Sequence, residues 1–193
     1  RLGTNKMNIY TVMKATQGFA NYLKSNGCHK VAIAYDSRNK SEVFAKKAAE
    51  VFAANDVKVY IFSELMPTPM LSFAVRELKL DGGIVITASH NPAKYNGYKV
   101  YGSDGCQITE IAANSIFGEI QRVDIFNGVE QIGFLEAQNQ GKIEYISEEI
   151  LDRYMEYLFE RDLHQKRENS LKIVYTPLNG TGLKPVMRAL RQA

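Results

Sequence analysis

The sequence predicts an α/β fold with three layers, in which a mixed but mostly parallel sheet lies between two layers of helices. Between residues 9 and 87, amphipathic helical patterns alternate with short apolar runs, the order produced by right-handed β-α-β crossovers. Residues 98–101 return as a strand too soon for a crossover helix, so we expect this strand to be antiparallel. A hydrophobic share of 45% and a charged share of 23% are typical of a chain with a globular core.

The first half of the chain supplies three helices and three strands. Apolar spacing predicts helices over residues 9–24, from 41 to 55 and after Pro67, and strands over residues 31–35, 57–62 and 83–87. Ser41 is placed to cap the second helix with its hydroxyl, and Asn55 to end it. The third helix begins at Pro67-Thr-Pro69 and is expected to bury Leu71, Val75 and Leu78.

The second half is less regular. Thr109 is expected to cap a helix that runs to about Arg122, whereas residues 124–145 have weak periodicity and three glycines and are interpreted as irregular. The pattern then predicts a helix over residues 147–163, a polar joint over residues 166–170, a strand over residues 171–175 and a glycine-rich turn before a last helix. We interpret residues 1–168 as one domain and residues 169–193 as the truncated start of a second.

Composition excludes several classes of function. The net charge is +3, with interspersed charges and no basic block, which disfavours nucleic-acid binding. No apolar stretch approaches the ~20 residues that a membrane span needs, and the first residues lack the apolar core of a secretory signal. Cys28 and Cys106 lie far apart without metal-type spacing, so we expect two reduced thiols and a cytoplasmic protein. Because the chain opens on Arg1 and closes inside a helical pattern, we expect it to be a piece of a longer protein.

Two polar loops follow predicted strands and mark a candidate site. Asp36-Ser37-Arg38 follows the strand ending at Tyr35, and Ser89-His90-Asn91-Pro92 follows the strand ending at Thr87. In open α/β sheets chemistry collects past the carboxyl ends of the strands, so both loops should open on one rim, together with Lys99. Arg38 and Lys99 suggest an anion, and phosphate commonly takes several cationic donors.

Simpler interpretations of these residues stay open at this point. Ser89 could be a solvated turn residue, Arg38 a surface ion-pair partner, and Lys99 a side chain reaching from an edge strand. A serine hydrolase is disfavoured, because Ser89 has Thr87 and Asn91 where a G-x-S-x-G elbow requires glycines. The residues alone therefore support an anion-handling rim and specify no reaction.

Three segments resemble one enzyme family. T-A-S-H-N-P-A-K-Y-N-G-Y-K-V, residues 87–100, is similar to the active-serine loop of the α-D-phosphohexomutases, the phosphoglucomutase and phosphomannomutase family. A-Y-D-S-R-N-K-S and M-P-T-P-M-L-S-F-A-V resemble two further segments of that family in order and spacing. The resemblance covers residues 1–125, and K-I-V-Y-T-P-L-N-G-T-G looks like the start of the second domain of the family.

The resemblance implies a phosphoserine enzyme with four domains around one cleft. Ser89 would exchange a phosphoryl group with a hexose phosphate through a sugar bisphosphate, and its phosphoryl oxygen would be one ligand of Mg²⁺. His90 would take part in catalysis by orienting the loop and contacting the phosphoryl group or sugar, and Lys99 would transfer a proton or stabilise charge. The family likeness also suggests that Arg38, Asn91 and Asn96 bind substrate or phosphate, and that Pro92 stiffens the loop.

Other features of the family are missing. Its glycine-rich opening is not recognisable at residues 1–8, and the aspartate-rich metal loop of domain II and the sugar and phosphate sites of domains III and IV are absent. We therefore expect the N-terminal part of a phosphoglucomutase-like enzyme, inactive without domains II–IV. A phosphomannomutase, a phosphopentomutase or a non-catalytic binding module of the same fold are the alternatives.

Overall fold

The computed structural model describes residues 1–161 and 171–192, and its centre is a five-stranded sheet with the order β4-β3-β1-β2-β5. The strands are β1 (Lys30–Tyr35), β2 (Lys58–Ile61), β3 (Gly82–Ile86), β4 (Tyr98–Gly102) and β5 (Ile143–Tyr145). All neighbouring strands are parallel except β4, which runs antiparallel to β3. The predicted mixed, mostly parallel sheet and its antiparallel return strand are confirmed.

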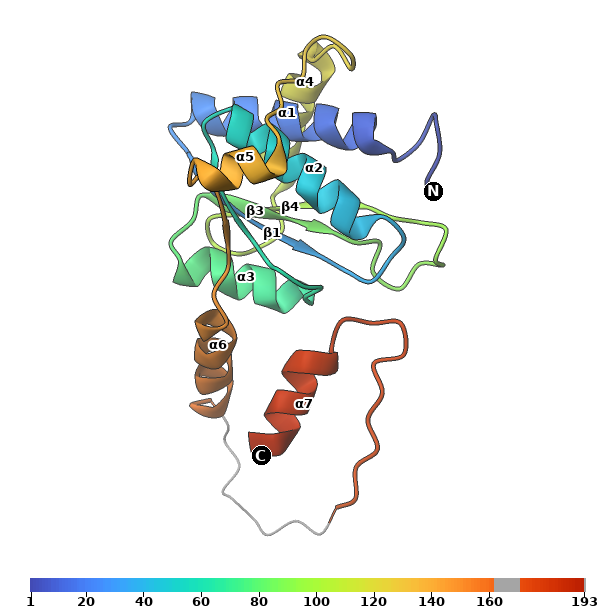
Figure 1. Cartoon of the computed structure of the whole chain (residues 1–193), viewed down its shortest axis with the longest axis vertical. Coiled ribbons are helices and arrows are strands. Elements are labelled where there is room, and N and C mark those ends of the chain that lie inside the picture. The colour runs from blue at the N-terminus through green and yellow to red at the C-terminus, as the bar shows by residue number, and fades with distance from the viewer. Residues whose placement is uncertain (162–170, 193) are drawn as a thin grey trace.

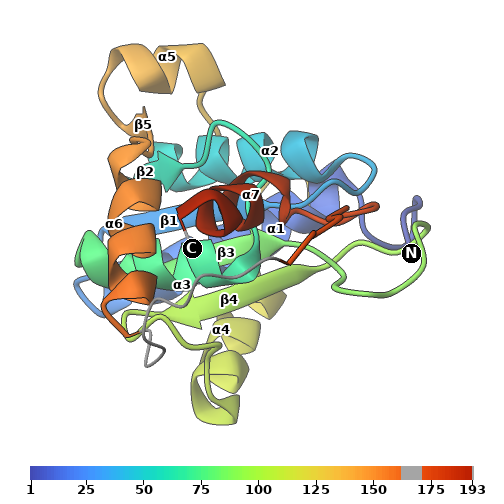
Figure 2. The ribbon, with the colours of Figure 1, turned by 90° about the horizontal axis from the view of Figure 1, so that it is seen from below.

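Helices cover both faces of the sheet and complete the three predicted layers (Figure 1). The helices on one side are α1 (Ile9–Ser25), α2 (Ser41–Ala54), α4 (Glu110–Arg122) and α5 (Phe134–Asn139). The other side carries α3 (Thr68–Glu77), α6 (Glu149–Phe159) and α7 (Leu183–Gln192), as the view from below shows (Figure 2). None of the helices described in residues 1–161 and 171–192 is both long and apolar enough to cross a membrane.

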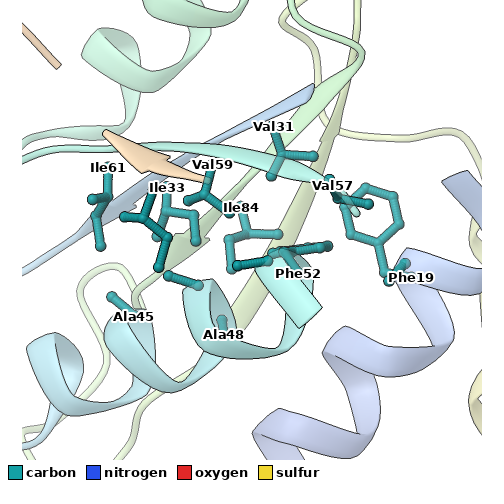
Figure 3. Packing of buried hydrophobic residues seen from close by; sticks show 14 of the residues in the cluster. Phe19, Val31, Ile33, Ala45, Ala48, Phe52, Val57, Val59, Ile61 and Ile84 are labelled. Carbon is teal, nitrogen blue, oxygen red and sulfur yellow. The ribbon is translucent and has the colours of Figure 1, made fainter. Parts of the chain in front are cut away.

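The two faces of the sheet have separate apolar cores because side chains alternate along each strand. Ile33, Val59 and Ile84 pack against Phe52 of α2 and Phe19 of α1 (Figure 3). Alternate positions of the same strands, including Ala32 and Val85, face α3 and α6. Full burial of an isoleucine or phenylalanine contributes roughly 1.5–3 kcal/mol. These cores hold the central strands, and hence the loops at their carboxyl ends, in fixed positions.

Most predicted elements of the first half are confirmed with shifts of one residue. Asn55 ends α2, and Leu71 and Val75 are buried on α3. In the second half, Thr109 caps α4 by accepting the amide of Ala112. Leu78 is only half-buried because it forms the C-terminal cap of α3. The β2 strand is shorter than the apolar run 57–62, since only four of these residues pair with β1.

The prediction that residues 124–145 are irregular is partly wrong. This segment contains α5 and the edge strand β5, which pairs in parallel with β2. Ala137 and Ile143 are buried in the core beside α2. The buried Gln17 also fixes the segment, because its Oε1 accepts the amide of Glu130 at 3.0 Å. These elements exist through tertiary packing and are too short to produce a sequence period.

The predicted strand over residues 171–175 is also wrong. These residues form no strand, and Leu171, Ile173 and Val174 are exposed. A strand needs a hydrogen-bonded neighbour, and within residues 1–161 and 171–192 none lies beside this segment. The last predicted helix is confirmed as α7, whose Lys184 and Arg188 form ion pairs with Glu148 and Asp152 at α6.

The predicted domain boundary at residues 168 and 169 lies outside the described residues, as do the polar joint over residues 166–170 and the last two residues of the predicted helix 147–163. The observed helix begins at Glu149 rather than Ser147, whose Oγ accepts the amide of Glu149, and it ends at Phe159, before the limit of the described residues.

Candidate active site

The two predicted loops open on one rim of the sheet. Their strands, β1 and β3, are adjacent and parallel, with Tyr35 opposite Ile86. The amide of Asp36 donates to the carbonyl of Ile86 at 3.2 Å, so the loops separate directly past the paired strand ends. This arrangement brings residues 36–40 against residues 87–97, as the parallel topology predicts.

Ser89 is exposed at this rim and has an unusual backbone conformation. Its φ angle is +55°, in the left-handed region that costs a non-glycine residue about 1–2 kcal/mol. Its amide donates to Oγ1 of Thr87 at 2.9 Å, and the next turn is closed by the amide of Asn91, which donates to the carbonyl of Ala88 at 3.1 Å. A conformation of this kind persists only where surrounding contacts determine it.

His90 lies next to the Ser89 hydroxyl but at a long distance. The Ser89 Oγ and the His90 Nδ1 are 3.4 Å apart, whereas hydrogen bonds of hydroxyl groups are usually below about 3.0 Å. His90 and Asn91 are both exposed, so both side chains are accessible to a ligand at the rim. The geometry suits contact with a group attached to Ser89 better than proton removal from its hydroxyl.

Arg38 is directed into the Ser89 loop, and its nitrogens face backbone carbonyls. Nη1 donates to the carbonyls of Pro92 and Tyr95, both at 3.0 Å. Nη2 donates to the carbonyls of Ser89 and Asn91. Nε lies 3.1 Å from Oδ2 of Asp36, with which it forms an ion pair, and is buried without a hydrogen-bond partner among the described residues. In this structure Arg38 therefore contacts the loop itself, and its predicted contact with phosphate stays a prediction.

Asp36 holds Arg38 in position. Its Oδ1 accepts the amide of Arg38 at 3.0 Å and the hydroxyl of Ser41 at 2.7 Å. Ser41 is consequently not the cap of α2. The cap position is Lys40, which has a left-handed backbone and no capping side-chain bond, and Ser41 is the first helical residue, with its hydroxyl buried under the loop.

Asn96 is buried and its amide group is committed within the protein. Its Nδ2 donates to Oγ of Ser41 at 2.9 Å and to the carbonyl of Asn39 at 3.2 Å, while its Oδ1 accepts the amide of Gly97. These bonds tie the far end of the Ser89 loop to the start of α2. Asn96 is thus part of the framework of the loop, and its predicted contact with substrate stays a prediction.

Lys99 lies on β4, opposite Val85 of β3, and is half-buried. It shares its strand face with Tyr101, which packs in the core on the α3 side. No hydrogen bond or ion pair joins Lys99 to the described Ser89 loop. Its predicted part in catalysis stays a prediction.

Further cations and framework residues were not anticipated from the sequence. The guanidinium of Arg1 and the ammonium of Lys94 lie 5.9 and 5.7 Å from the centre of the Tyr95 ring, and the amide of Leu2 donates to the carbonyl of Lys94. Among the missed framework residues, Thr87 had a visible signal, because a threonine two residues before a turn residue can accept its amide. Arg1 and Lys94 had none, since only the fold brings the first residues of the chain to this loop.

The described part of the chain offers little to a metal ion on its own. Within residues 1–161 and 171–192, no three histidine, cysteine, aspartate or glutamate side chains are grouped to hold one. A phosphoryl group on the exposed Ser89 hydroxyl would supply one hard oxygen ligand of the kind that Mg²⁺ prefers. The described residues thus offer Ser89 as one possible ligand and no cluster that would complete a metal site.

Comparison with known proteins identifies the family of the chain. Residues 1–125 match the family model described as "Phosphoglucomutase/phosphomannomutase, alpha/beta/alpha domain I". The chain belongs to the phosphoglucomutase/phosphomannomutase family. The matched range contains both rim loops and the antiparallel strand β4. The resemblance inferred from the three sequence segments is thus confirmed.

Several members of the phosphoglucomutase/phosphomannomutase family are similar over nearly the whole chain. A phosphoglucomutase of Staphylococcus epidermidis is 38% identical over 184 residues, which are 94% of this chain and 33% of the relative. A protein of Schizosaccharomyces pombe named "Probable phosphoribomutase" is also 38% identical, over 97% of this chain and 33% of its own length. The chain therefore spans about a third of these relatives and corresponds to the N-terminal region of phosphoglucomutases.

A solved family structure agrees with the fold. The phosphoglucomutase/phosphomannomutase family protein of Burkholderia thailandensis superimposes with a TM-score of 0.75 at 22% identity, over 99% of this chain and 40% of that one. At this identity the likeness concerns the fold alone.

Proposed function

We propose that the full-length protein is a phosphohexomutase of the phosphoglucomutase type, which interconverts hexose 1-phosphate and hexose 6-phosphate through a phosphoserine at Ser89. The observation that carries the proposal is the exposed Ser89 hydroxyl, presented at the rim of the sheet by a loop whose backbone is held by Arg38 and Thr87. A loop held in this way suits phosphoryl transfer, because that reaction depends mainly on positioning and electrostatic stabilisation.

Two successive transfers would complete the reaction. In the first, the bond between Ser89 Oγ and phosphorus breaks while phosphorus bonds to a free hydroxyl oxygen of the sugar phosphate; the proton of that hydroxyl passes to a base, and Ser89 Oγ takes up a proton. The resulting bisphosphate then turns over in the site. In the second, its other phosphoryl group passes to Ser89 Oγ, whose proton passes to a base, and the released sugar oxygen takes up a proton. Lys99 is the proposed proton carrier, a role that requires its ammonium to be desolvated or close to other cations.

The other groups at the rim would bind and neutralise. Mg²⁺, held in part by the phosphoryl oxygen on Ser89, would reduce the charge of the transferring group. His90 and Asn91 are accessible to contact that group or the sugar, and the cations of Arg1 and Lys94 contribute positive potential beside the loop. The further ligands of the metal and the sugar-binding residues are proposed to lie in other domains of the full-length protein.

A pentose phosphate is the second candidate substrate. The reason is the 38% identity to the protein named "Probable phosphoribomutase", which equals the identity to the staphylococcal phosphoglucomutase. The remaining candidates are a mannose phosphate as substrate and a non-catalytic binding role for the protein. The presence of Ser89, His90 and Lys99 argues against the non-catalytic role.

Mass spectrometry of the full-length protein purified from cells tests the proposal. The peptide containing Ser89 should carry about 80 Da of additional mass, equal to one phosphoryl group. Ser89→Ala should remove this mass and abolish mutase turnover, while the free energy of unfolding should change by no more than ~0.5 kcal/mol, because the side chain is exposed. Ser103→Ala, at another exposed turn serine, is the matched control and should change neither. Unphosphorylated Ser89 that reacts with a fluorophosphonate would contradict the proposal and favour a hydrolase.

A further inference from the structure

Both Nη atoms of Arg38 donate hydrogen bonds to backbone carbonyls of the Ser89 loop, four in all. We infer that Arg38 is a positioning residue, whose guanidinium fixes the backbone of the loop so that Ser89 holds its phosphoryl group in line with the sugar. This inference rests on the proposed mutase function for its catalytic consequence. Its structural part, that Arg38 holds the loop closed, is testable without any activity.

The loop needs a cation at its centre. It turns back on itself so that the carbonyl oxygens of Ser89, Asn91, Pro92 and Tyr95 all point to one guanidinium. Four carbonyl dipoles directed at one place repel each other unless a positive group lies between them. The planar guanidinium provides N–H groups in several directions and remains charged at every physiological pH.

These contacts act on Ser89 directly. Arg38 binds the carbonyl of Ser89 while Thr87 binds its amide, so the peptide groups on both sides of its α-carbon are fixed. These two hydrogen bonds explain how Ser89, which is not a glycine, is kept at a φ of +55° with its hydroxyl exposed. An error of about 1 Å in the position of a reacting group can reduce the rate by about 100-fold.

The guanidinium of Arg38 is also held in place by burial and by Asp36. Only 11% of the Arg38 side chain is exposed, and Asp36 faces its Nε. The hydroxyl of Ser41 donates to Asp36, and its Oγ in turn accepts a hydrogen bond from the side-chain Nδ2 of Asn96 at the far end of the loop. The loop is thus held at its start, middle and end by residues 36–41.

The alternative is that Arg38 binds the phosphoryl group directly. Both Nη atoms already donate to carbonyls of the loop, and Nε is enclosed against Asp36. A phosphate could be bound by Arg38 only if loop contacts were given up. Substitution by lysine distinguishes the two roles. Lysine retains the positive charge that a phosphate contact needs, but its single nitrogen cannot reproduce the hydrogen bonds of the guanidinium to the loop carbonyls.

Kinetics of Arg38→Lys and Arg38→Ala in the full-length protein distinguish these roles. The positioning role predicts that kcat falls about 100-fold in both variants, with KM changed less than about threefold because the substrate contacts stay in place. Arg122→Lys, at an exposed arginine on α4, is the matched control and should leave kcat unchanged. Near-normal kcat in Arg38→Lys, with a large loss only in Arg38→Ala, would overturn the inference in favour of a charge effect on phosphate.

Proteolysis of the same full-length proteins reports on the loop independently of activity. Trypsin should cut after the exposed Lys94 about tenfold faster in Arg38→Lys than in the parent or in Arg122→Lys, since cleavage follows the population of the open loop. Cleavage at the parental rate would overturn the inference even if the enzyme is active. Faster cleavage in a protein that shows neither phosphoserine nor turnover would support the loop contact while refuting the mutase proposal.

Asp36→Asn provides a second variant in case the Arg38 substitutions prevent folding. This variant keeps the guanidinium of Arg38 but removes the negative charge of Asp36 that pairs with it. We expect kcat to fall about tenfold and cleavage after Lys94 to accelerate by a smaller factor than in Arg38→Lys, consistent with loss of a charge-assisted contact. An unchanged kcat and an unchanged rate of cleavage in Asp36→Asn would contradict the inference that Asp36 holds Arg38 in position.

Discussion

At the scale of single residues, Tyr98 on β4 couples stability to alkaline pH. The hydroxyl of Tyr98 lies 3.1 Å from Oγ1 of the fully buried Thr16. Burial raises the pKa of Tyr98 well above its ordinary value near 10, and burial likewise raises the pKa of Tyr35 to about 12. Both phenols therefore ionise more readily in the unfolded chain than in the folded protein.

The sign of the effect follows from linkage. For a raised tyrosine pKa, the stability contribution is fully present below the unfolded value near 10 and is lost as the pH rises through the folded-state pKa. We expect the free energy of unfolding, measured in urea, to fall from pH 9.5 upward and to fall less steeply in Tyr98→Phe. At pH 7 both phenols are neutral in both states, so the difference between variant and parent there reports only the lost hydrogen bond. Equal slopes above pH 10 would contradict the assignment.

What the sequence predicts at this scale is residue type and neighbourhood, but not bonding partners. The T-A-S-H-N-P segment led correctly to an exposed serine at a strand end, and D-S-R led to an arginine at the same rim. Arg38 and Asn96 were nevertheless assigned to ligands, whereas the structure directs them to carbonyls and to Ser41. A side chain's partner depends on the tertiary placement of atoms more than fifty positions away in the chain, and local pattern carries no information about it.

At the scale of elements, the close approach of α1 and α4 depends on Gly18. A Cβ atom at this position would lie 2.6 Å from the backbone nitrogen of Ile120, a distance that side chains do not tolerate. Gly18→Ala should push the helices apart and lower the free energy of unfolding by about 1–3 kcal/mol. Gly118→Ala on α4 is the matched control, because a Cβ there meets nothing within 4 Å, and it should stabilise by about 0.5–1 kcal/mol. Urea denaturation should give opposite signs, and equal signs would contradict this account of the contact.

Elements were predictable where each was long enough to show its own period. The patterns of α1, β1, α2, α3 and α4 each gave bounds within a few residues of those observed. The three residues of β5 and the six of α5 are too short for a period, and they form because Ile143 and Ala137 fill space beside α2. The apolar residues 171–175 show the converse, since β-forming composition gives no strand without a neighbouring strand.

At the scale of the whole molecule, architecture was the most predictable property. Alternation of helices and strands, together with the short return to β4, restricts the chain to an open mixed sheet with two helical layers. The rim chemistry follows from that topology, because adjacent parallel strands end at the same edge. The bonding inside the rim does not follow from topology, so the sequence places the rim residues without giving their hydrogen-bond partners.

The last prediction concerns the mutase activity of residues 1–193 without the rest of the full-length protein. The chain spans about a third of its relatives, and its described residues hold no group of three metal-binding side chains. Because the loss of one group that stabilises the transition state costs about 10²–10³ in rate, residues 1–193 alone should convert glucose 1-phosphate at less than about one thousandth of the full-length rate. A coupled assay for glucose 6-phosphate, with glucose 1,6-bisphosphate and Mg²⁺ present, measures this, and the full-length protein is the control. Calorimetry should show correspondingly weak Mg²⁺ binding by the chain, since only Ser89 is assigned to the metal here. Turnover comparable to that of the full-length protein would mean that residues 1–193 contain the whole catalytic apparatus, and that the Ser89 rim needs no other domain.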